Sequence, residues 1–274
     1  MKRTLPTILA LSFLAVSTAQ AQPVVVGYPL GVNPLGNFIN GPPFGPFTSW
    51  TLLGFETWGD VYLSGDLFIP SSAMSSGNDI GGGVFSGWLP VTAIAQGAFY
   101  DCPNLVSVVF PSTVTSINAS YESDEDGWPS FGLCPSLTQM YFMGNAPDLG
   151  NMGLANGINT TIYYLPSTSG WGSNFNGSPT ILWNPTILTN DGTFGISNNQ
   201  FGFTITGTPN IPIMVMACTN LNIPTYESEQ GTLVVPFING WTPLTNVLLT
   251  NGSFYFSEPL QTTSSGRFYK ISPP

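Results

Sequence analysis

The sequence has 274 residues, of which only 7% are charged while 42% are hydrophobic and 13% are aromatic. Its 31 Gly and 25 Pro exclude long helices, and its apolar content excludes a disordered chain. The chain has no His, which excludes catalytic triads and metal sites that need this residue, and a net charge of −10 argues against nucleic acid as a partner.

The N-terminus is typical of a secretory signal peptide. Lys2-Arg3 precedes an apolar run over residues 5–16, and Ala19-Gln20-Ala21 places small residues at a cleavage site. We therefore expect residues 1–21 to be removed and the remainder to be secreted or displayed at the cell surface. No membrane span is expected after this cleavage, because no later stretch approaches about 20 continuous apolar residues.

The next segment, residues 22–49, is dense in Gly and Pro and predicts an irregular entry segment. From Trp50 onward the chain contains alternating stretches that end at proline, such as residues 66–70, and these predict short strands.

The middle of the chain contains a repeat. Residues 91–94 align with residues 114–117 at an offset of 23, and residues 99–110 align with residues 131–142 at an offset of 32. An insertion of nine residues in the second copy explains the difference between the two offsets. A weaker earlier copy is indicated by residues 68–71, which echo Val109-Phe110-Pro111-Ser112, with Val84-Phe85 standing in for Ala98-Phe99.

Each copy has the pattern of a turn followed by a strand. Phe99, Cys102 and Leu105 recur at a spacing of three, which suits a tight helical turn, while residues 106–110 alternate as a strand does and Pro111 ends them. One such unit cannot bury its own apolar face, but stacked copies would bring equivalent side chains over one another in a continuous core.

These motifs allow a family resemblance to be stated. Residues 97–105 (GAFYDCPNL), followed by Val108-Val109-Phe110-Pro111, resemble the BspA-like leucine-rich repeats of bacterial surface proteins. The second copy keeps Cys134-Pro135-Ser136-Leu137, and residues 163–183 resemble the closing segment after the last repeat of that family. The resemblance covers residues 50–185 and implies a short, mainly β solenoid with one turn or short helix and one strand per repeat. Since only two copies are clear, flanking strands are expected to act as caps.

Residues 186–274 have a different character. Short apolar or alternating runs separated by Asn, Gly and Pro predict an antiparallel β-sandwich. The predicted strands are 194–196, 200–205, 213–218, 232–235, 253–257 and 267–271. This region is similar to a C-terminal β module of secreted bacterial proteins, a resemblance that implies extracellular display.

The three cysteines, Cys102, Cys134 and Cys218, are an odd number, which excludes a dense disulfide framework. Their spacing is not that of a CxxC motif, and the simplest interpretation is that they are small buried side chains, at least one of them unpaired or paired between chains.

The insertion in the second copy carries the only charge cluster of the chain. Glu122, Asp124 and Asp126 place alternate carboxylates ahead of a Gly, and such oxygen ligands are suited to calcium. A solvated acidic loop that keeps the protein soluble explains the same residues. No other cofactor is expected.

Aromatic residues gather in the segment predicted to close the repeats. Among them Tyr163, Tyr164 and Trp171 are candidates for ligand binding, since exposed rings on a rigid surface stack on sugars or anchor proteins. The alternative is that these rings, and Trp128 with them, fill the core and its caps.

The sequence offers little to a catalyst, because serine nucleophiles lack a His and no phosphate-binding GxxxxGK motif occurs. Paired carboxylates remain the one route to catalysis, and we do not expect an enzyme. The favoured function is recognition or adhesion at the cell surface, with an extracellular protein or glycan bound to the repeat surface. The alternatives are a self-associating protein of a surface layer or fibre, and a C-terminal module that serves export or attachment.

Overall fold

The computed structural model describes residues 32–33, 50–52, 64–69, 71–78, 84–119, 128–154, 159–219, 241–260 and 266–274. These residues form β-strands and turns, without a helix, so the predicted mainly β fold is confirmed. None of them belongs to a helix of the length and apolarity that a membrane crossing requires. The chain divides into two compact units whose boundary lies between Ile181 and Leu182.

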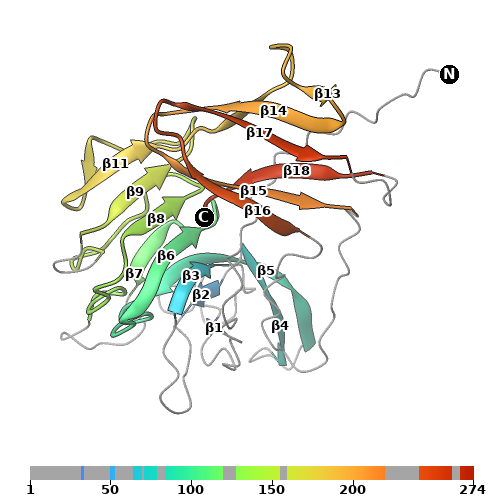
Figure 1. Ribbon diagram of the computed structural model, residues 1–274. Helices are drawn as coiled ribbons and strands as arrows, with labels where there is room; N and C mark the ends of the chain where they lie inside the picture. Colours follow the sequence, from blue (N-terminus) through green and yellow to red (C-terminus); the bar gives the residue numbers. More distant parts are fainter. Residues whose placement is uncertain are drawn as a thin grey trace. The chain divides into compact units, whose positions relative to one another are not determined.

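The first unit contains a six-stranded sheet in the order β10-β11-β9-β8-β6-β3 (Figure 1). Its strands are β3 (Ser64–Phe68), β6 (Asn104–Phe110), β8 (Gln139–Phe142), β9 (Thr161–Tyr164), β10 (Asn174–Phe175) and β11 (Ser178–Leu182). Neighbouring strands from β3 to β9 are parallel, whereas β10 and β11 form an antiparallel hairpin at one end of the sheet.

A second sheet of this unit is organised around the long strand β5. It comprises β1 (Val32–Asn33), β2 (Trp50–Leu52), β4 (Ser72–Asn78), β5 (Val84–Ala95) and β7 (Ser116–Ala119). The first part of β5 pairs antiparallel with β4, and its last residues pair in parallel with β2 and β7. The expectation that Val84-Phe85 replaces Ala98-Phe99 in a turn is therefore wrong, since both residues lie in the hairpin with β4.

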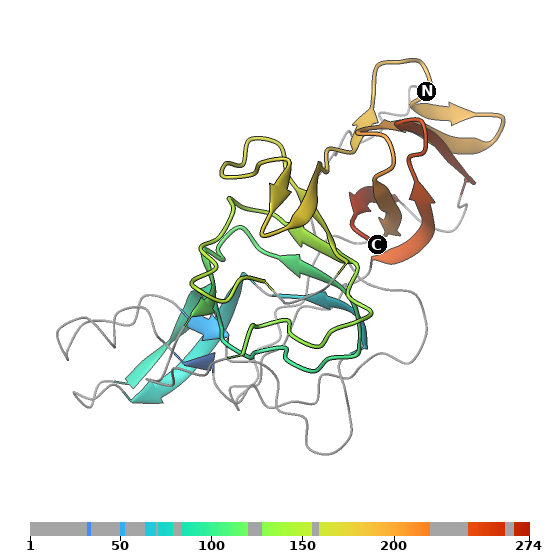
Figure 2. The same cartoon turned by 90° about the vertical axis from the view of Figure 1, so that its left-hand side faces the viewer.

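The observed registers follow the offsets read from the sequence. Ile94 pairs with Ile117 at the offset of 23, and Phe110 pairs with Phe142 at the offset of 32. Phe68 pairs with Val109, which is the alignment predicted for the weaker early copy. Consecutive turns are also hydrogen-bonded to each other, and Figure 2 shows these connecting segments running beside one another.

The core of the first unit lies against one face of the parallel sheet. Side chains on successive strands stack there in columns, because equivalent positions of parallel strands are neighbours. The Phe110 and Phe142 rings stack with centroids 4.4 Å apart, and the Phe99 and Phe131 rings do so at 5.0 Å. All four rings are at most 2% exposed.

The second unit consists of two antiparallel sheets. One contains β12 (Thr186–Leu188), β13 (Gly195–Ser197), β14 (Gln200–Thr206) and β17 (Ser253–Pro259). The other contains β15 (Pro212–Cys218), β16 (Thr242–Leu248) and β18 (Phe268–Ser272). Five of the six strands predicted for this region coincide with observed strands, and the sixth, at 232–235, lies outside the described residues.

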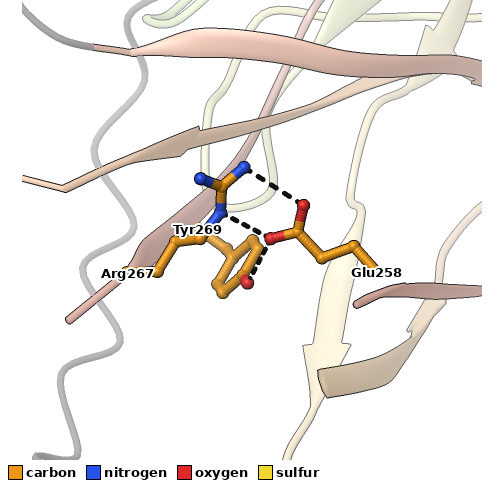
Figure 3. A network of polar contacts seen from close by, with 3 residues as sticks. All are labelled: Glu258, Arg267 and Tyr269. Carbon is orange, nitrogen blue, oxygen red and sulfur yellow. Dashed lines mark hydrogen bonds and ion pairs between the residues drawn. The ribbon is translucent and has the colours of Figure 1, made fainter. Parts of the chain in front are cut away.

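Side chains of β18 connect these two sheets. The Tyr269 ring stacks on Phe201 of β14 at 5.0 Å, and its hydroxyl donates a hydrogen bond to Glu258 of β17. Arg267, just before β18, forms an ion pair with the same carboxylate, with Nε 2.5 Å from Oε1 (Figure 3). The arginine thus serves the packing of the unit, and burial together with the bond to Glu258 raises the pKa of Tyr269.

Candidate functional site

The structure separates the three aromatic residues that the sequence proposes as a ligand site. Tyr163 and Tyr164 are successive residues of β9, so their side chains lie on opposite faces of the sheet. Tyr164 lies with Trp171, whose ring stacks on it with centroids 5.6 Å apart. Tyr163 instead stacks on Tyr141 at 4.8 Å. The predicted trio is therefore two separate groups.

Trp171 closes the end of the hydrophobic core. Its ring also packs against Phe142 at 5.0 Å and against Phe175 at 5.0 Å. The indole Nε1 is buried and has no hydrogen-bond partner in the structure. A ring that contacts three aromatic neighbours has little free face left to offer a ligand, so this geometry favours the core-filling interpretation of Trp171.

The other group lies on the face of the parallel sheet opposite the core. Tyr141 is fully buried and donates a 2.6 Å hydrogen bond to Gln139, and its pKa is raised, mainly by burial. Further along this face the Ser107 hydroxyl donates a 2.7 Å hydrogen bond to the Asp66 carboxylate. Burial raises the pKa of Asp66 by more than this hydrogen bond lowers it, so the pKa is raised. Tyr163 is itself only 7% exposed, so this face does not present open rings.

The exposed aromatic surface lies at the turns between strands. Trp128 is 60% exposed, and its ring tilts against Tyr100 with centroids 4.8 Å apart. Tyr100 in turn lies directly against Gly132, where an added Cβ would come within 2.7 Å of the ring. The next residue, Leu133, is 58% exposed. These side chains, with the exposed Asp101, are called the turn patch below.

The backbone holds the turn patch in place. Asp101 and Leu133 occupy equivalent positions of the two copies, and both have left-handed backbone conformations with φ of 56° and 55°. The Asp101 N–H donates to Gly132 at 2.8 Å, and the Gly97 N–H donates to Trp128 at 2.8 Å. The turn patch therefore lies on two turns that are hydrogen-bonded to each other. A rigid support of this kind reduces the conformational entropy that the protein would lose on binding a ligand.

An exposed indole that packs on a partly buried tyrosine beside a carboxylate has a defined chemistry. The face of an indole stacks on the apolar face of a sugar or on an apolar protein side chain, and a nearby carboxylate accepts hydrogen bonds from hydroxyl or amide groups. The sequence placed Trp128 among the core-filling rings. Its position directly after the acidic run 122–126 was the signal for exposure, because charged residues are mostly found at protein surfaces.

The proposed calcium ligands Glu122, Asp124 and Asp126 lie outside the described residues. Within the described ranges, no group of three or more Cys, Asp or Glu side chains is arranged to hold a metal ion. In comparisons with known proteins, no family model, curated protein or solved structure matches this chain.

Proposed function

We propose that this chain is a secreted or cell-surface recognition protein that binds an extracellular protein or glycan through the turn patch. The observation that carries the proposal is the exposure of Trp128, a large aromatic ring held by Tyr100 on a framework of hydrogen-bonded turns. Interfaces typically take most of their binding energy from a few such aromatic anchors.

The proposed scaffold is a short BspA-like leucine-rich-repeat solenoid followed by an antiparallel β-sandwich. Its support is the parallel stacking of the two copies at the offset of 32, with Phe99 over Phe131 and Phe110 over Phe142. For the second region, the support is the contact of Tyr269 with Phe201 across two antiparallel sheets. The scaffold's part in binding is passive, since it presents side chains in a fixed arrangement.

Protein and glycan arrays probed with the purified chain test the binding proposal. We expect Trp128→Ala to weaken a specific signal about tenfold or more, which corresponds to the loss of about 1.4 kcal/mol or more at an aromatic anchor. Tyr255→Ala is the matched control, because Tyr255 is 51% exposed but belongs to β17 of the other unit. Signals that are equal for both variants and the parent chain contradict the proposal.

Self-association is a second candidate, favoured by an exposed apolar residue on a short strand. Ile196 of β13 is 53% exposed, and among the strands that the structure describes β13 pairs with β14 alone. A strand with an open side can pair with another chain. Size-exclusion chromatography at low and high salt separates the candidates: assemblies that dissociate in an Ile196→Lys variant support self-association, and a monomer at every salt concentration rules it out.

A further inference from the structure

The two cysteines of the repeat copies occupy equivalent positions in adjacent turns. Cys102 and Cys134 differ by the same offset of 32 as the stacked rings of Phe99 and Phe131 before them. The paired residues Ser107 and Gln139 after them keep this offset too. Residues before and after the two cysteines are therefore paired at the same offset, and this pairing places Cys102 and Cys134 next to each other in adjacent turns.

Contacts of the sulfur atoms agree with this placement. The Cys134 thiol lies 3.2 Å from the carbonyl oxygen of Phe99, which belongs to the turn of the first copy. The Cys102 thiol lies 4.0 Å from the carbonyl oxygen of Tyr100, the next residue of the same turn. Both sulfurs therefore lie against consecutive peptide groups of one turn.

The spacing of the stack suits a covalent bond between the two residues. The turns that carry the two cysteines are hydrogen-bonded to each other, with the Asp101 N–H 2.8 Å from the Gly132 oxygen, and adjacent backbone segments paired in this way are about 4.8 Å apart. Disulfides join residues whose Cα atoms are separated by about 4.4–6.8 Å, so little backbone movement is needed. The two thiols also interact: the pKa of Cys134 is lowered chiefly by a hydrogen bond from Cys102, and the same bond raises the pKa of Cys102.

We propose that Cys102 and Cys134 form a disulfide that links the two repeat copies when the chain meets a small-molecule disulfide oxidant. The half-buried Cys102 is the point of entry, because Cys134 is fully buried. As the Cys102 sulfur attacks one sulfur of the oxidant and forms a mixed disulfide, its proton passes through the hydrogen-bonded Cys134 sulfur to the thiol that is released. The Cys134 thiolate then attacks the Cys102 sulfur and displaces the second thiol. Two electrons pass from the cysteines to the oxidant, and their two protons appear on the released thiols.

The test exposes the reduced full chain to a buffer of oxidised and reduced glutathione, unfolds it, alkylates the remaining thiols and measures the mass. Of the three cysteines, we expect one to carry the alkylating group. The other two should be joined in a disulfide, which makes the chain two hydrogen atoms lighter and leaves neither of them alkylated. Chymotryptic peptides analysed without reduction should contain residues 102 and 134 in one cross-linked product. A chymotryptic digest is suitable because Lys and Arg together number only 4.

Three variants complete the test. Cys218→Ala should leave the cross-link intact, because Cys218 lies in β15 of the other unit. Cys102→Ser should abolish it, and the change at this half-buried position is expected to preserve the fold, which circular dichroism checks. Cys134→Ala should also abolish it. The oxidised parent chain should melt at a higher temperature than the reduced one, and this difference should vanish in Cys102→Ser.

Three outcomes overturn the proposal. These are three alkylated cysteines after oxidation, a lasting glutathione adduct on Cys102 of the parent chain, and a cross-link that contains Cys218. The result is independent of ligand binding, so failure of the array experiment with Trp128→Ala leaves this test unaffected.

Discussion

At the scale of single residues, Asn118 at the end of β7 holds together three parts of the first unit. Its amide Nδ2 donates to the carbonyl oxygens of Leu149 and Gly153, and its Oδ1 accepts a 2.7 Å bond from the Ser130 N–H. It is 5% exposed and has a left-handed backbone with φ of 62°. Asn tolerates this conformation better than most residues, and its side chain has both the donors and the acceptor that the site needs.

We expect Asn118→Ala to lower the free energy of unfolding by about 2–4 kcal/mol, because it leaves several buried polar groups without partners and adds backbone strain. Chemical denaturation measures the loss. Asn199→Ala isolates the backbone contribution, because Asn199 has the same φ of 62° but is exposed. Equal losses for the two variants would show that the buried hydrogen bonds contribute nothing.

Leu133 has a conformation that is unfavourable for its residue type. A leucine in the left-handed region is strained, and more than half of this side chain is exposed, so burial does not compensate fully. We expect Leu133→Gly to stabilise the chain by about 1 kcal/mol, measured as a higher melting temperature. Asp101→Gly at the equivalent position should gain less, since Asp adopts this conformation more readily. A destabilised Leu133→Gly variant would show that the side chain contributes packing energy.

At the scale of elements, strand register was the most predictable feature. Two copies of one sequence stack in parallel only if equivalent residues face each other, so the offsets of 23 and 32 fixed the pairs Ile94 with Ile117 and Phe110 with Phe142. Strands β12 and β16 were missed because they carry no repeated motif or clean alternation. The hairpin of β4 and β5 was missed because β5 changes partner along its length.

The exposure of individual aromatic rings was the least predictable feature. Tryptophan is suited both to hydrophobic cores and to binding surfaces. The sequence pattern alone does not indicate which aromatic rings are covered by other side chains in the fold. Trp171 was expected to be partly exposed and is partly buried, but its ring meets Phe142, Tyr164 and Phe175. Trp128 meets Tyr100 and is 60% exposed.

These two tryptophans should behave oppositely when truncated. We expect Trp171→Ala to cost about 2–4 kcal/mol of unfolding free energy, because it opens a cavity at the end of the core. Trp128→Ala should change stability by about 0.5 kcal/mol or less, as is usual at exposed positions. Urea denaturation of both variants, followed by circular dichroism, measures the difference. Equal costs would contradict the assignment of Trp171 to the core and Trp128 to the surface.

At the scale of the whole molecule, stability should depend on pH through a buried lysine and several buried tyrosines. Lys270 is 2% exposed, its ammonium group lies 4.7 Å from the centre of the Trp241 ring, and burial lowers its pKa from 10.5 to about 8. Between these values Lys270 binds more protons in the unfolded chain than in the folded chain, so its titration raises the free energy of unfolding as the pH rises. Burial raises the pKa of Tyr141, Tyr163 and Tyr269, so above pH 10.0 the folded chain binds more protons and stability falls.

We therefore expect maximal stability between about pH 9 and 10, measured as the denaturation midpoint across a pH series. Lys270→Met should be more stable than the parent chain at pH 7 by about 2 kcal/mol, and this advantage should shrink as the pH approaches 10.5. Parallel pH profiles for the two chains would show that Lys270 titrates equally in both states.

The hairpin of β10 and β11 limits where strands can be added to the six-stranded sheet. Its outer strand has two residues, Asn174–Phe175, and so offers another strand very little backbone to pair with. A further strand in register with β6 and β8 would therefore be added ahead of this hairpin, where neighbouring strands are parallel, and not beyond it. Chains with more copies of the turn-and-strand unit would then share one hairpin at this edge of the sheet and differ in the number of parallel strands beside it.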